Sequence, residues 1–84
     1  MDGRIAAKIL EKIRESYSVP GDIAALADMI GGADRDSVIE GIMVGRMYNA
    51  FYYQTRRILG RNPTPDEFED FLDIVRDDAR RTAP

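Results

Sequence analysis

Six arginine, asparagine and tyrosine residues recur in the middle of the sequence, and each lies three or four residues from another member of the set. This spacing lines side chains up along one face of a helix. A guanidinium group is a planar fork of donors that fits carboxylates and phosphates, and a tyrosine ring offers a flat apolar surface for stacking. The pattern therefore favours binding of a protein surface or of a nucleic acid. We call these residues the basic-aromatic face: Arg46, Asn49, Tyr53, Arg56, Arg57 and Arg61.

Two glycines and two tyrosines form a second set on the same stretch, which we call the glycine-tyrosine seam: Gly41, Gly45, Tyr48 and Tyr52. A glycine inside a helix costs about 1 kcal/mol relative to alanine, so close approach of another helix should compensate. We expect that neighbour to come from the same chain, with a second chain across a two-fold axis as the alternative. Glycines four residues apart also mediate the packing of transmembrane helices, but this stretch is too polar to be one.

Acidic side chains recur one turn apart near the C-terminal end of the sequence, at Asp66, Asp70, Asp73 and Asp77. Carboxylates are ligands for hard cations such as Mg²⁺ or Ca²⁺, but one exposed helix face does not enclose an ion. We therefore interpret this acidic row as a solvated face that is also able to meet arginines of a second chain. No metal site is predicted.

Enzyme chemistry has few suitable side chains in this sequence. The chain contains no histidine and no cysteine. No glycine-rich phosphate loop follows a strand, and no serine has the sequence setting of a nucleophile. We predict that the protein is not an enzyme, with no catalytic residue and no cofactor.

Composition favours one small domain covering residues 1–84, with a net charge of -3. A chain of this size without a disulfide or a zinc site has a thin margin of stability, which favours self-association into a homodimer. The charge is uneven: residues 41–63 carry four arginines and no acid, whereas residues 64–84 carry seven acids against three arginines. The N-terminal residues are too charged for a signal peptide, so we expect a soluble, cytoplasmic protein without a membrane span.

Hydrophobic periodicity predicts four helices, at about residues 2–17, 22–30, 36–59 and 65–81. The third carries apolar side chains over more than half its circumference, so we expect it at the centre of a compact all-α, four-helix domain. Its N-cap is Asp34 or Asp36, or Ser37 in a capping box with Glu40, and Thr64 with Glu67 predicts a capping box for the fourth. Val19, Pro20 and Gly21 are predicted to end the first helix, and Asp22 to be the N-cap of the second. Two core faces are predicted, one in the second helix (Ile23, Leu26, Ala27, Ile30) and one in the fourth (Phe68, Phe71, Leu72, Val75, Ala79).

Residues 23–42 resemble a helix-turn-helix, with Ala27 at the small position and Gly31 at the turn. The N-terminal turns of the second helix of that segment present Asp34, Asp36 and Glu40 with only Arg35 to offset them, which disfavours an approach to DNA, so we prefer a plain helical corner.

These patterns lead to a hypothesis of a non-enzymatic helical interaction module that self-associates. It would bind a protein partner through the basic-aromatic face, which has no obvious partner within the chain. The alternative is a small nucleic-acid-binding regulator that uses the same face.

Overall fold

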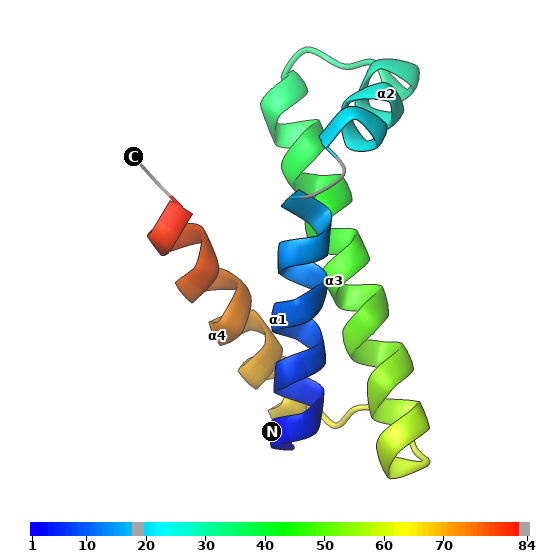
Figure 1. Ribbon diagram of the computed structural model, residues 1–84, viewed down its shortest axis with the longest axis vertical. Coiled ribbons are helices and arrows are strands. Elements are labelled where there is room, and N and C mark those ends of the chain that lie inside the picture. Colours follow the sequence, from blue (N-terminus) through cyan, green and yellow to red (C-terminus); the bar gives the residue numbers. More distant parts are fainter. Residues whose placement is uncertain (18–19, 83–84) are drawn as a thin grey trace.

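The computed structural model describes residues 1–17 and 20–82, with side chains for residues 1–15 and 21–78. It contains four helices and, in the described part, no strand (Figure 1). The helices are α1 (Gly3–Tyr17), α2 (Pro20–Ile30), α3 (Arg35–Leu59) and α4 (Pro65–Thr82). The all-α fold with a long third helix is confirmed.

The ends of α3 follow from two local signals. The carboxylate of Asp34 accepts a hydrogen bond from the backbone N–H of Ser37 at 3.1 Å, so Asp34 is the N-cap and the helix begins one residue before the predicted start. At the other end Gly60 adopts a left-handed conformation, with φ of 70°, and its N–H donates to the carbonyl of Arg56. Glycine is favoured there because it has no Cβ.

The predicted capping box at the start of α4 is confirmed. The N–H of Thr64 donates to Oε1 of Glu67 at 2.9 Å, and the N–H of Glu67 donates to the hydroxyl of Thr64 at 3.2 Å. Pro65 occupies the first helical position, where its missing N–H is not needed.

Helix α2 begins two residues before the predicted start, at Pro20. The sequence reasoning treated this proline as part of the preceding break, but proline is also well suited to the first position of a helix. Asp22 therefore lies in the first turn rather than at the N-cap. Val19, part of the predicted break, lies outside the described residues.

Helix α3 contacts each of the other three helices, as expected of a central helix. Helix α1 runs alongside it, α2 packs near its beginning, and α4 diverges from the pair towards its C-terminal end (Figure 1). The core lies where α1, α3 and α4 meet, and the rings of Phe51 and Phe71 stack there with centroids 4.9 Å apart. The buried core residues are Ile5, Ile9, Ile13, Met47, Phe51 and Phe71.

Three side chains predicted to be in the core are exposed instead. In α2 only Ile23 and Ala27 are buried, whereas Leu26 and Ile30 are 43% and 60% exposed. Helix α2 packs mainly against α3 and so buries only a narrow stripe, which leaves its outer apolar residues in solvent. Phe68, in the first turn of α4, is 40% exposed, because its ring meets the half-exposed ring of Tyr48 edge-on and the rest of the ring stays in solvent. The side chain of Ala79 lies outside the described residues.

None of the helices in the described residues has both the length and the apolar composition needed to cross a bilayer.

Candidate interaction surface

One side of α3 is left uncovered by the other helices. The buried residues Met47, Ala50, Phe51 and Thr55 mark the side that faces the core. At about 100° per residue, the exposed positions occupy roughly the opposite half of the circumference. This exposed arc contains the glycine-tyrosine seam, in which Tyr52 is half-buried, and the adjoining Asn49, Tyr53, Arg56 and Arg57.

The two seam glycines are both exposed. A Cβ atom built at Gly41 or Gly45 would meet no heavy atom of the described residues within 4 Å, apart from the nearby backbone of α3 itself. The expectation that another helix of the same chain packs closely on them is therefore wrong for the described residues. The reason is that the core, marked by Met47 and Ala50, lies on a different side of α3.

The tyrosine end of the seam borders an aromatic groove. Tyr48 is 43% exposed, and its ring makes edge contacts with Phe68 and Phe71 at centroid distances of 6.1 and 5.9 Å. The groove has a volume of about 330 Å³. It is lined by Tyr48, Phe51, Tyr52, Pro63, Thr64, Pro65 and Phe68. Its walls place exposed aromatic surface directly beside the open glycines.

Two arginines of the basic-aromatic face have partners inside the chain. A guanidinium nitrogen of Arg46 lies 3.7 Å from the carboxylate of Glu15 on α1, so the expectation of no partner within the chain is wrong for this residue. Arg61 donates to both carboxylate oxygens of Glu67, at 2.7 and 3.3 Å. These hydrogen bonds, with the one from the Thr64 backbone, lower the pKa of Glu67 to about 2. Through these hydrogen bonds Arg61, which follows the end of α3, holds the first turn of α4 close to it.

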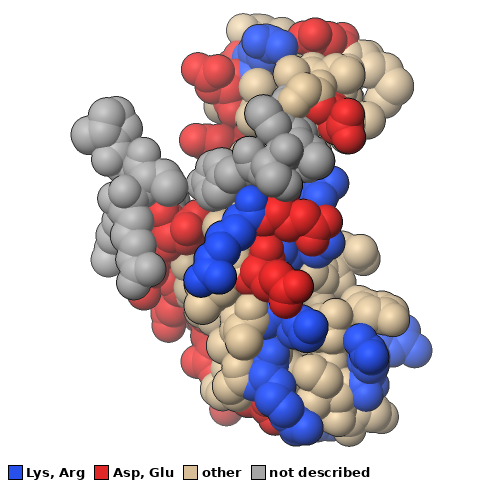
Figure 2. All heavy atoms as spheres, viewed as in Figure 1, with Lys and Arg blue, Asp and Glu red and all other residues tan. Residues whose placement is uncertain are grey.

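The other two arginines, Arg56 and Arg57, are exposed and form no ion pair with a described residue. Tyr53, one turn before them, is 59% exposed. These three side chains are the part of the basic-aromatic face that is open to a partner. Figure 2 shows several Lys and Arg side chains towards the end of the molecule where α3 finishes, whereas acids are spread over the length of the molecule.

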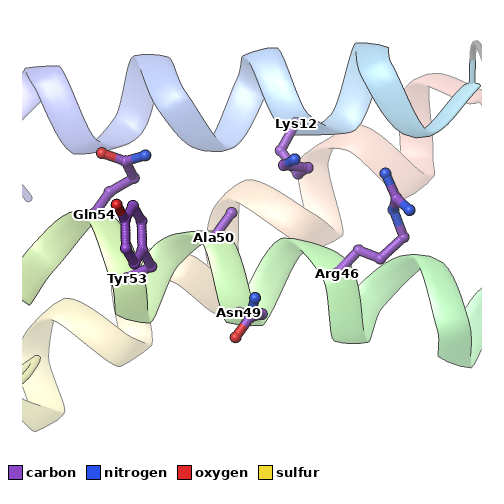
Figure 3. Close-up of a pocket in the computed structure, with 6 residues that line it drawn as sticks. All are labelled: Lys12, Arg46, Asn49, Ala50, Tyr53 and Gln54. Carbon is purple, nitrogen blue, oxygen red and sulfur yellow. The ribbon is translucent and has the colours of Figure 1, made fainter.

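A second groove of about 350 Å³ runs between α1 and α3 (Figure 3). The groove is lined by Lys12 of α1 and by five residues of α3: Arg46, Asn49, Ala50, Tyr53 and Gln54. Of these, Arg46, Asn49 and Tyr53 belong to the basic-aromatic face. Glu15 lies within 4 Å of both cationic groups and offsets their charge. Sequence reasoning did not include Lys12 or Gln54, because only the packing of α1 on α3 brings them together. Oε1 of Gln54 is buried without a hydrogen-bond partner.

The acidic row of α4 is partly engaged. Asp70 accepts a hydrogen bond from the amino group of Met1 at 2.7 Å, and Asp73 lies 3.5 Å from Arg76. Across the described residues, no three side chains of the kinds that bind metals come close enough to hold an ion.

Comparison of the chain with models of known protein families, with characterised proteins and with solved structures finds no match. The functional inference therefore rests on the geometry of the exposed arc of α3.

Proposed function

We propose that this chain is a small non-enzymatic interaction module that self-associates through the exposed arc of α3. The observation that carries the proposal is the open space at Gly41 and Gly45 in the middle of the longest helix. Two interior glycines together cost that helix about 2 kcal/mol relative to alanine. No contact inside the described chain offsets this cost, whereas the backbone of a helix from another molecule would.

The surroundings of the glycines support the same proposal. Tyr48 and Phe68 present aromatic surface beside them, and Tyr53 lies further along the same helix. Aromatic residues and arginine are favoured in protein interfaces, with polar residues at the rim. Arg56 and Arg57 supply such a rim. A cytoplasmic location stays a prediction from the sequence.

Sedimentation equilibrium over the micromolar range tests self-association of the 9.5 kDa chain. The apparent mass should rise with concentration towards twice the monomer mass. Tyr48→Asp should abolish this rise, because it places a charge in the seam. Leu26→Asp is the matched control, since Leu26 is also 43% exposed but lies on α2. A strict monomer at high micromolar concentration would overturn the proposal.

A single-stranded nucleic acid is the second candidate partner, and one observation favours it. Arg56 and Arg57 form no ion pair within the described part of the chain and follow the exposed ring of Tyr53, so they could contact phosphates while a base stacks on the ring. Two phosphate contacts predict that log K falls with log salt with a slope of about -1.4. Fluorescence anisotropy with a mixed-sequence oligonucleotide at low ionic strength measures this slope. Binding that is absent, or that is unchanged by Arg56→Glu with Arg57→Glu, contradicts the nucleic-acid candidate.

A further inference from the structure

We propose that the partner is a second copy of the chain whose α3 packs antiparallel across a two-fold axis between Arg46 and Met47. Gly41 of each copy then faces Tyr52 of the other, and Gly45 faces Tyr48. This inference rests on the proposed self-association and names its geometry.

The first support is the spacing of the glycine-tyrosine seam. Its four residues are separated by intervals of four, three and four positions, which read the same in both directions. When the α3 helices of two copies run antiparallel, every seam residue of one copy therefore lies opposite a seam residue of the other. Because the glycines occupy one half of the seam and the tyrosines the other half, each small residue meets a large one. The tyrosine rings then fill the space that the glycines leave open.

A parallel pairing of the same seam fails on shape. It places each glycine opposite a glycine and each tyrosine opposite a tyrosine. The first half of the interface would then hold voids, while the second half would be crowded. Interfaces that bind specifically pack as tightly as protein interiors, so the antiparallel pairing is favoured.

The second support is the distribution of charge along α3. Residues 34–40, its N-cap and first turns, carry three acids and one arginine, whereas residues 41–59 carry three arginines and no acid. Antiparallel pairing brings the acidic end of one copy beside the basic end of the other, with Asp36 at the level of Arg57. At about 100° per residue, Asp36 and Arg57 lie on the side of α3 opposite the seam, so the two charged ends attract each other over a distance and form no direct ion pair. A parallel pairing would bring like charges together at both ends.

The third support is the aromatic groove beside the seam. In the antiparallel pair the two-fold axis is perpendicular to both α3 helices. The flank of α3 that faces α4 therefore lies on the same side of the interface in both copies. Val44 is 40% exposed and lies on the α4 flank, as does Tyr48. In the antiparallel arrangement, Val44 of the second copy lies at the level of Asn49, beside Tyr48 at the mouth of the groove. An exposed aliphatic side chain is thereby covered by aromatic surface.

Spin labels on single introduced cysteines test this arrangement, because the chain has no cysteine of its own. Asn49 lies close to the proposed axis, and Asp36 and Arg57 lie equally far from it on either side. At 1.5 Å per residue, two labels at Asn49→Cys are separated along the helix by roughly 8 Å, and two at Asp36→Cys by roughly 32 Å. Arg57→Cys should give the same long separation. An equal mixture of Asp36→Cys and Arg57→Cys chains should add a distance shorter than either of these, because the two sites then lie at the same level along the helices.

Sedimentation of the labelled proteins separates failure of this inference from failure of the proposed function. A dimer with similar short distances at all three sites is parallel and overturns the antiparallel arrangement alone. A dimer without a short distance at Asn49→Cys uses another surface and also overturns it. Protein that stays monomeric overturns the proposed function and this inference together.

Discussion

Replacing Phe51 by alanine is expected to lower the free energy of unfolding by about 3 to 5 kcal/mol. The Phe51 side chain is 1% exposed and stacks on Phe71 at a centroid distance of 4.9 Å, so its removal opens a cavity between α3 and α4. A domain of 84 residues has a total stability of only about 4 to 13 kcal/mol. The variant should therefore lose a large share of its stability and unfold at a clearly lower urea concentration.

Urea titration followed by circular dichroism measures this loss. Tyr53→Ala is the matched control, because it removes an aromatic ring from the same helix at a position that is 59% exposed. The control should change the free energy of unfolding by under about 1 kcal/mol. An equal loss in both variants would show that Phe51 does not hold the core together.

Replacing Gly45 by alanine or leucine is expected to move fold stability and self-association in opposite directions. A Cβ at this position meets nothing within 4 Å, so the single chain should gain about 1 kcal/mol from the better helix former. In the proposed dimer the same side chain occupies the space that receives a tyrosine ring. The dimer dissociation constant should rise at least tenfold, and more for leucine than for alanine.

The two effects are measured separately, by urea unfolding at a concentration where the protein is monomeric and by sedimentation equilibrium. Gly21 offers a matched control, since it also lies in a helix, is exposed and has open space at its Cβ position. Gly21→Leu should leave the dissociation constant unchanged. If Gly45→Leu also leaves it unchanged, the seam is not the interface.

The helices and most of their ends could be predicted because the signals are local. Thr64, Pro65 and Glu67 specify the start of α4 through contacts within four residues, and Gly60 ends α3 in the same way. The start of α2 was placed late because Pro20 suits both a break and a first helical position. A proline that is compatible with both therefore does not show where the helix begins.

The surroundings of the candidate surface could not be predicted, because they depend on how the helices pack. The contact between Arg46 and Glu15 joins two helices, and no local pattern in either predicts it. Likewise, the spacing of Gly41 and Gly45 indicates a close neighbour but not which one. Only the position of the other helices shows that these glycines face open space.

The composition of the core has a consequence for synthesis of the protein. Ile5 near the start of the sequence and Phe71 close to its end belong to the same buried cluster. A nascent chain on the ribosome can form α1, α2 and α3 while Phe71 is still to be added. Until then one face of the Phe51 ring lacks the ring that covers it. The domain therefore completes its core only after most of its sequence has been translated, and α4 is the segment that closes it.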